Sequence, residues 1–169
     1  LEAGAKKIEP FKIDLDAEVP TGRRDWFGQY EMTSVTKSLS TGIQTIQVKP
    51  LPENGKPDTF TGAVGSFNFN VKSSKTTLKA GESLDLEVSV SGKGNLKLFT
   101  LPKPILPSAL EMYDPAHAEN VQTPITGMTG SISDKYTIIP QFKGKYTLKP
   151  IVFSYYDLTS KSYKTLTSK

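Results

Sequence analysis

The sequence predicts an all-β protein made of one complete immunoglobulin-like β-sandwich that is preceded by the last strands of a second β-sandwich. Apolar and polar residues alternate along the chain with the period of two that is typical of strands with one buried face. The 13 Gly and 12 Pro are scattered, which favours short strands joined by turns over long helices. The 8 Phe and 7 Tyr can supply a core, so we expect a folded chain.

Residues 67–169 are predicted to form the complete sandwich. The clearest strand is 83–91, which places four aliphatic side chains on one face, and we expect the strands at 133–139 and 145–157 to face the same core. The expected core residues are Leu84, Leu86, Val88, Val90, Tyr136, Ile138, Tyr146 and Leu148. Further short strands are expected at 95–100, 110–113, 118–123 and 161–167, with a hairpin turn at 92–95. This number and spacing favour an immunoglobulin-like sandwich, with a barrel of similar strand count as the alternative.

Residues 1–50 are predicted to be the C-terminal strands of the preceding sandwich. Strands are expected at 7–19 and 42–49, with a polar segment at 20–40 between them. Two or three strands cannot bury both sides of a core, so we expect this part to be a piece of a domain and the chain to be excised from a longer protein. Residues 51–66, rich in Pro and Gly, are predicted to be the interdomain linker.

The charge of the chain gives no support to a nucleic-acid partner. The sequence has 21 Lys and Arg against 17 Asp and Glu, a net charge of +4. Only Arg23 and Arg24 are arginines, and the lysines are dispersed among apolar residues, as on solvated strand faces. Nucleic-acid surfaces instead cluster Arg and Lys on one face. We therefore expect no nucleic acid to bind.

Residues that could carry chemistry are few, and no catalytic residue, cofactor-binding residue or metal ligand is predicted. The chain has no Cys, and its one histidine, His117, is expected in an exposed loop. The acidic run that starts at Asp14 begins like a calcium loop, but it has Val19 where the sharp turn needs Gly and Asp25 where Glu is needed. Gly92-Lys93-Gly94 lacks the third glycine of a dinucleotide fingerprint. We predict that the protein is not an enzyme.

One segment has the composition of an interaction site. Arg23, Arg24, Trp26 and Phe27 lie together in the polar segment, and Trp and Arg are the residue types most enriched among interface hot spots. The structural alternative is that Trp26 and Phe27 fold back on the linker or cap the incomplete front sandwich.

Several spaced motifs together resemble one protein family. They are Val48–Pro57, Phe60–Phe67, Ser91–Leu98, Leu101–Pro104, Tyr113–Pro115, Ile139–Pro140, Phe153–Asp157 and Tyr163–Leu166. In the same order, these motifs resemble the BatD-like oxygen-tolerance family, the aerotolerance-operon proteins of bacterial envelopes. The resemblance covers roughly residues 43–167.

The resemblance implies an envelope protein with tandem β-sandwich domains on the periplasmic side of the bacterial inner membrane, anchored by a transmembrane helix outside this chain. No apolar stretch here approaches the ~18 residues of a membrane span. Family members are encoded beside von Willebrand A-domain proteins and a MoxR-type AAA ATPase, which implies protein partners. The family pattern offers no catalytic residues to carry over.

The function predicted from these observations is a non-catalytic, periplasmic protein–protein interaction or scaffold module of a membrane-anchored BatD-like protein. The alternative is a carbohydrate-binding module, because β-sandwiches can present aromatic platforms to sugars, and Tyr155, Tyr156 and Tyr163 are available. Binding to a glycan array, against pull-down of envelope proteins, discriminates the two.

A chelator should leave the thermal stability of the chain unchanged, because the sequence offers no adequate set of metal ligands. The measurement is the melting temperature with and without EDTA. A lower melting temperature in EDTA would show that a structural metal had been missed.

Overall fold

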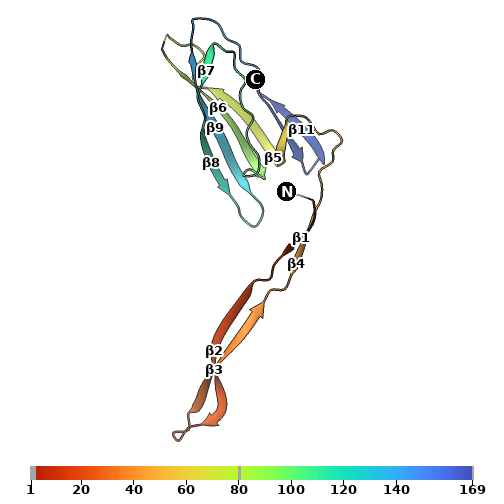
Figure 1. The fold of residues 1–169 in the computed structure, drawn as a ribbon, viewed down its shortest axis with the longest axis vertical. Helices are drawn as coiled ribbons and strands as arrows, with labels where there is room; N and C mark the ends of the chain where they lie inside the picture. The colour runs from red at the N-terminus through yellow and green to blue at the C-terminus, as the bar shows by residue number, and fades with distance from the viewer. Residues whose placement is uncertain (1–2, 80, 169) are drawn as a thin grey trace. The chain divides into compact units, whose positions relative to one another are not determined.

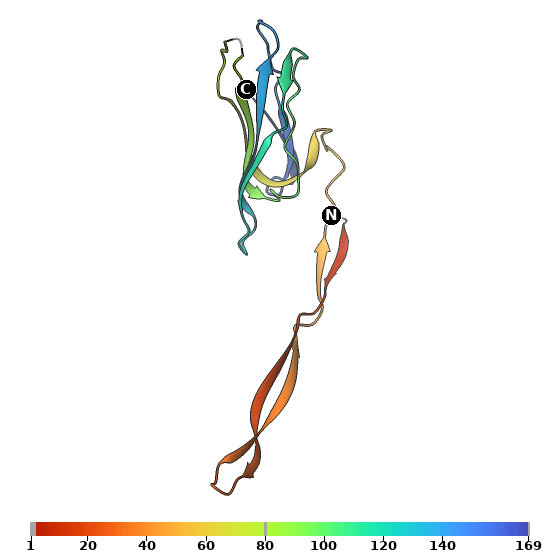
Figure 2. The ribbon, with the colours of Figure 1, turned by 60° about the vertical axis from the view of Figure 1, so that its left-hand side comes forward.

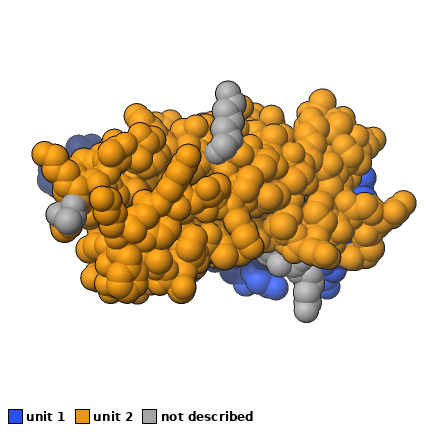
Figure 3. Space-filling view, turned by 90° about the horizontal axis from the view of Figure 1, so that it is seen from above, with its two compact units in different colours: residues 1–52 blue, residues 53–169 orange. Residues whose placement is uncertain are grey.

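The computed structural model describes residues 3–79 and 81–168, and across these residues it has eleven β-strands and no helix. The predicted all-β class is therefore confirmed. The chain divides into two compact units, Leu1–Pro52 and Glu53–Lys169, which Figure 3 distinguishes by colour. Each unit is described separately below.

Unit 1 is a two-stranded antiparallel ribbon in two sections. Strand β1 (Gly4–Ile8) pairs with β4 (Gln44–Val48), and β2 (Lys12–Arg24) pairs with β3 (Tyr30–Ser40) (Figure 1). Between the sections, the Phe11 amide donates to Thr41 Oγ1 at 3.0 Å, and the Thr41 amide donates to the Phe11 carbonyl at 3.1 Å. These bonds keep the two sides together where the ladder is interrupted.

Residues 20–40 are predicted to be a polar segment between two strands, and the absence of a strand there is wrong, because the segment contains the end of β2 and all of β3. The sequence conceals β3 because one face of this strand carries only Ser and Thr over Ser34, Thr36 and Ser38. Their hydroxyls have partners on the opposite strand: Thr36 donates to Asp16 at 2.6 Å, and Ser38 donates to Asp14. Short hydroxyl side chains are compatible with a strand when the neighbouring strand supplies acceptors.

Unit 2 holds a seven-stranded mixed sheet. Its strands are β5 (Phe60–Ser73), β6 (Leu84–Gly94), β7 (Leu110–Met112), β8 (Ala116–Gln122), β9 (Thr129–Pro140), β10 (Val152–Asp157) and β11 (Ser162–Thr167). The order is β11-β10-β5-β6-β9-β7, and β8 also pairs with β9. All neighbours are antiparallel except β10 and β5, which are parallel.

Strand β5 bends and changes partner, and this curls the sheet (Figure 2). Its first part pairs with β10, and from Gly65 onward it pairs with β6, where Gly65 lies opposite Gly94. A Cβ on Gly94 would lie 2.3 Å from the Val64 carbonyl oxygen, so only glycine permits this approach of the two backbones. The φ angles of Gly65 and Gly94 are +150° and +155°.

The N-terminal part of unit 2 includes residues of the predicted linker 51–66. Residues 60–66 form the first half of β5. Just before them, Thr59 Oγ1 lies 2.6 Å from Ser154 Oγ, and the Phe60 ring meets the Tyr163 ring edge-on with 5.0 Å between centroids. These contacts cover the outer face of β10, which explains why consecutive residues of β10 are buried.

The core of unit 2 lies inside the curled sheet and is centred on Phe153, which is 1% exposed. The Phe153 ring stacks with Phe69 at 5.6 Å between centroids and contacts Phe67 at 6.1 Å, so β10 packs across the sheet onto β5. The predicted core face is confirmed. Leu86, Val88, Val90, Tyr136 and Ile138 are buried, and Leu84, Tyr146 and Leu148 are partly buried against them.

Two segments expected as strands and one expected turn differ in the structure. Residues 95–100 form turns and bends instead of a strand, because the Asn95 side chain accepts from the Val64 amide at 2.7 Å and donates to the Gly62 carbonyl at 2.8 Å. The hairpin turn expected at 92–95 is mostly strand, since β6 runs on to Gly94. Of the expected strand 145–157, only Val152–Asp157 pairs with neighbours, and residues 145–150 belong to no ladder.

The turn between β10 and β11 is organised by a buried carboxylate. Asp157 is 5% exposed, accepts the Thr159 amide at 2.7 Å and the Ser160 amide at 3.2 Å, and is bonded to the Lys164 ammonium. The bond to Lys164, followed by the two amide bonds, lowers the pKa of Asp157 to about 2.

Replacement of Leu86 by alanine should destabilise the chain by ~2–5 kcal/mol, because it leaves a cavity in a tightly packed core. Leu86 is 3% exposed and contributes to the face shared by β6 and β9. The free energy of unfolding, measured in urea, checks this, and an effect below ~1 kcal/mol would show that this face is not packed as described.

The pair of Asp157 and Lys164 should make stability depend on pH in the acid range. Because the folded-state pKa lies near 2 and the ordinary value is 3.8, the carboxylate contributes stability above about pH 4 and loses it as the pH falls toward 2. Asp157→Asn should therefore be less stable than the natural chain at pH 7, with the difference shrinking below pH 4. Asp58→Asn, at an exposed position, is the control, and a difference that did not vary with pH would contradict the assignment.

Candidate functional site

The four residues predicted for interaction come together at the tip of the hairpin formed by β2 and β3. Arg23 and Arg24 end β2, and Trp26 and Phe27 lie in the turn that precedes β3. The structure thus places all four at one end of the hairpin, which could be recognised only once β3 was known.

Asp25 holds this turn in one conformation. Its Oδ1 accepts hydrogen bonds from the amides of Phe27 and Gln29, each at 2.9 Å. In the backbone, the Asp25 amide donates to the Gln29 carbonyl at 2.8 Å, and the Gly28 amide donates to the Asp25 carbonyl at 3.0 Å. Gly28 has a φ of +78°, which glycine adopts without strain. An aspartate followed by glycine three residues later was the sequence signal for this turn.

Arg24 is fixed beside the turn by Tyr30, its partner across the ladder. The guanidinium carbon lies 4.6 Å from the centroid of the Tyr30 ring, and Nη2 donates to the tyrosine hydroxyl at 2.9 Å. A cation over an aromatic face is stabilised by the ring quadrupole. One of the two arginines therefore has a defined position, while the Arg23 side chain is exposed.

The aromatic side chains at the tip are open to solvent. Trp26 is 96% exposed and Phe27 is 86% exposed, so neither ring is covered by other described residues. This differs from the alternative in which the two rings fold back on the linker or cap the front sandwich. Two adjacent aromatic rings on an ordered turn can contact another surface with little loss of backbone entropy. Chemically, the tip offers apolar area together with two positive charges.

The faces of the hairpin differ from each other below the tip. The register of β2 and β3 places Ile13, Val19, Val35 and Leu39 on one face, and all four are exposed. The opposite face carries Asp14 and Asp16, which accept the hydroxyl bonds described above. Among residues 3–79 and 81–168, no three His, Cys, Asp or Glu side chains are grouped so as to hold a metal ion.

The other residues considered for chemistry or sugar binding lie in unit 2. His117 is on β8, an edge strand rather than a loop, and its Nδ1 lies 2.6 Å from Asp134 Oδ1. Tyr155 and Tyr156 are buried, and the half-buried Tyr163 packs edge-on against Phe60 and Tyr156. The three tyrosines therefore form no exposed platform, which argues against the carbohydrate-binding alternative.

The part of the chain that the structure describes contains no helix of sufficient length and apolarity to cross a membrane.

The fold and this site define an all-β module with a curled mixed sheet and an ordered aromatic hairpin tip. Residues 71–169, more than half of the chain and all within unit 2, match the BatD DUF11-like domain. The chain belongs to the BatD family, as the motifs in its sequence indicated. The motifs at 48–67 precede the matched range. No curated protein and no solved structure matches the chain.

Proposed function

We propose that the chain is a non-catalytic protein–protein interaction or scaffold module of a membrane-anchored BatD-like protein on the periplasmic side of a bacterial inner membrane. The observation that carries the proposal is the ordered turn at Asp25, which exposes Trp26 and Phe27 beside two arginines. Monomeric surfaces seldom leave adjacent large aromatic rings exposed without a contact to make. Membership of the BatD family supports the envelope setting.

The proposed architecture is a tandem of β-sandwich domains, in which strands β5 to β11 form an immunoglobulin-like unit that begins at Phe60 and not at residue 67. Curling of the unit 2 sheet, which packs β10 onto β5, supports a sandwich. The exposed apolar face of β2 and β3 supports the interpretation of residues 1–50 as strands of another sandwich, since a two-stranded ribbon has no core of its own.

The proposed partners are proteins, foremost the von Willebrand A-domain envelope proteins and the MoxR-type ATPase system that accompany this family. The tip would insert its two rings into an apolar recess of the partner, with Arg23 and Arg24 at the rim. Charge at a rim accelerates encounter, while buried aromatic anchors supply most of the binding free energy.

The test is direct binding of the purified chain to the neighbouring von Willebrand A-domain protein. Trp26→Ala should weaken the affinity by about 30-fold or more, which is the loss typical of a hot-spot aromatic residue. The free energy of unfolding should stay within ~0.5 kcal/mol of the natural chain, because the ring is exposed.

Ile125→Ala is the matched control, since Ile125 is a fully exposed apolar side chain in unit 2. It should bind like the natural chain. If Trp26→Ala bound with unchanged affinity, the tip would not be the contact; if the natural chain bound neither the A-domain protein nor any other envelope protein, the interaction role would be lost.

A further inference from the structure

Strand β8 forms a free edge of the sheet in unit 2. It pairs with β9 from Ala116 to Gln122 in an antiparallel register without a shift, and β9 is its one neighbour in the sheet. Strand β11 lies at the other end of the strand order, and Figure 1 shows the two strands on opposite sides of unit 2. An extension of β11 beyond Ser168 would run beside Pro150, and not beside β8.

The backbone of β8 has unused hydrogen-bonding groups on this edge. Residues in a strand direct their amide and carbonyl groups alternately to one side and to the other, so every second residue of β8 directs both groups away from β9. Among residues 3–79 and 81–168, no other segment bonds to these groups. Sheets commonly protect a free edge with Lys, Pro or a bulge, and residues 116–122 contain none of these. The edge is therefore open to pairing with another strand.

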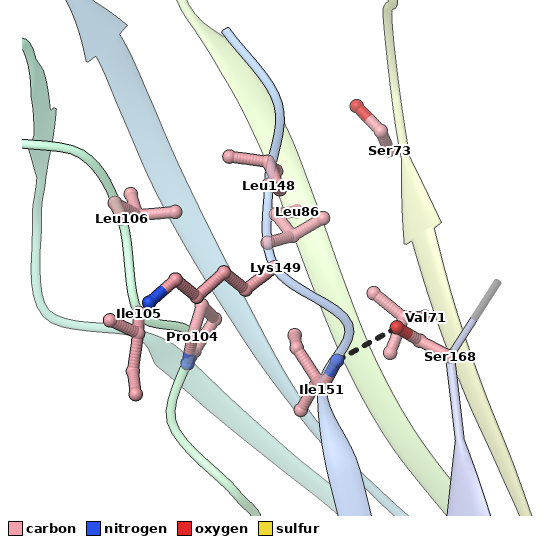
Figure 4. A pocket seen from close by; sticks show the side chains of 10 residues that line it. All are labelled: Val71, Ser73, Leu86, Pro104, Ile105, Leu106, Leu148, Lys149, Ile151 and Ser168. Atoms are coloured by element: carbon pink, nitrogen blue, oxygen red, sulfur yellow. Dashed lines mark hydrogen bonds between the residues drawn. The ribbon is translucent and has the colours of Figure 1, made fainter.

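Two cavities of unit 2 lie away from this edge. One, of about 170 Å³, is lined by Val71, Leu86, Leu106 and Leu148, among others (Figure 4). The other, of about 1040 Å³, is lined mainly by the connections from β5 to β6 and from β9 to β10. Neither is lined by a residue of β8, so neither would give pockets to the side chains of an added strand. Recognition at this edge must come from the side chains of β8 itself.

The two faces of β8 carry different side chains. The face turned away from the core carries short, uncharged side chains, those of Ala116, Ala118 and Asn120. The other face is the core side, because Glu119 lies through β9 in the row of the buried Val90, and His117 is two residues away on the same face. The edge thus combines a small, neutral face with a face that carries an acid and a histidine.

A twofold axis perpendicular to the sheet at Ala118 would pair two copies of β8 with complementary side chains. On the outer face, Ala118 lies opposite its own copy, and Ala116 lies opposite Asn120. On the core side, His117 lies opposite Glu119 of the partner subunit, and directly opposite residues have Cβ atoms about 4.5–5.5 Å apart. The side chains that meet are therefore either small or an acid and a histidine.

Adjacent registers are less favourable. An axis at Glu119 would place two carboxylates opposite each other, which destabilises a pair of strands. An axis at His117 would bring Pro115, which has no amide proton, into the ladder. The side chains of β8 therefore favour the axis at Ala118.

His117 can bridge two carboxylates across the paired edge. Within the chain, its Nδ1 lies 2.6 Å from Asp134 Oδ1, and no described residue bonds to Nε2. With a proton on each nitrogen, the ring donates from Nδ1 to Asp134 and from Nε2 to Glu119 of the partner subunit. Pairing therefore favours the protonated ring, so association should be stronger at about pH 6 than at about pH 8.

The imidazole is surrounded on this face by carboxylates and an ammonium group. Lys97 reaches Glu119 from the segment 95–100 at 3.4 Å. Asp114 lies on the same side, where burial, followed by the charges of Asp134 and Asp114, raises the pKa of Tyr136. Carboxylates and ammonium groups ordinarily titrate outside the range of about pH 6 to pH 8. A pH effect on association in this range therefore reports the one histidine of the chain.

We infer that β8 is a self-association site, through which two copies of the chain join edge to edge into one continuous sheet centred on Ala118. The ladder contains residues 116–120 of both copies. One strand pair is a small contact, so the dimer is reversible. The inference goes beyond the function proposed above and uses no residue of the hairpin tip, so the two can fail separately.

The experiment measures the mass of the whole chain by sedimentation equilibrium over a range of protein concentrations. The natural chain should form a reversible dimer. Ala118→Lys and Ala118→Glu each place two like charges on the axis, so each variant should have a dimer dissociation constant raised about fivefold or more. An equimolar mixture of the two variants places Lys opposite Glu and should restore the dimer.

Asn70→Lys is the matched control. Asn70 is exposed and lies in the same cross-strand row as Ala118, through Ser89 and Ser133, but on β5 in the interior of the sheet. The variant adds the same charge to the same face and should dimerise like the natural chain. Because both positions are exposed, the urea midpoints of all variants should match that of the natural chain.

His117→Gln tests the bridge. The glutamine side chain has no proton to gain between about pH 6 and pH 8, so the variant should lose the strengthening of the dimer at the lower pH.

Four results would overturn the inference. A natural chain that stayed monomeric up to ~1 mM would remove self-association. Dimers that tolerated both Ala118 variants would place the contact elsewhere, as would loss of the dimer in Asn70→Lys. A mixture of the two Ala118 variants that stayed monomeric would exclude the axis at Ala118. A natural dimer of equal strength at both pH values would exclude the bridge through His117.

Discussion

The architecture of unit 2 depends on the contact between the backbones of Gly65 and Gly94. Here β5 leaves its parallel partner β10 and joins the antiparallel partner β6, and a Cβ on either glycine would lie 2.3 Å from a carbonyl oxygen of the opposite strand. Because both positions lack a side chain, the sheet can bend sharply enough for β10 to pack over β5. The ring of Phe153 then reaches Phe67 and Phe69, and the aromatic core closes. Without that bend, β10 and β11 would continue as a flat extension with one face uncovered.

The alternation of apolar and polar residues leads to buried apolar faces in unit 2 and to exposed ones in unit 1, because the two units have different numbers of strands. In unit 2, seven strands enclose the apolar faces of β6 and β9. In unit 1, two strands leave Ile13 and Leu39 exposed, so ladder bonds and the hydroxyl bonds of Thr36 and Ser38 hold the hairpin together. A ribbon of this kind has an ordered end only where local bonds define it. Asp25 and Gly28 provide those bonds at the tip, which is why the exposed aromatic rings have a defined backbone beneath them.

Side-chain periodicity in the sequence predicted which strand faces are buried. It did not predict which segments pair as strands. Leu86, Val88 and Val90 predicted the buried face that the structure shows, whereas the contact site predicted from the residue types at 23–27 stays a prediction. Strand β3 was missed because Ser and Thr on one face resemble a loop, and the start of β5 was missed because Gly62 and Gly65 resemble a linker. Residues 145–150 show the limit most clearly: Tyr146 and Leu148 alternate as in a strand and pack as in a strand, yet periodicity says nothing about whether a neighbouring strand is present.

The proposed contact at the tip would rely on side chains and not on backbone pairing. Affinity would come from the apolar area of Trp26 and Phe27, so recognition would depend on the shape of one recess in one partner. Because Asp25 and Gly28 fix the backbone beneath the two rings, little conformational entropy would be lost when the tip docks.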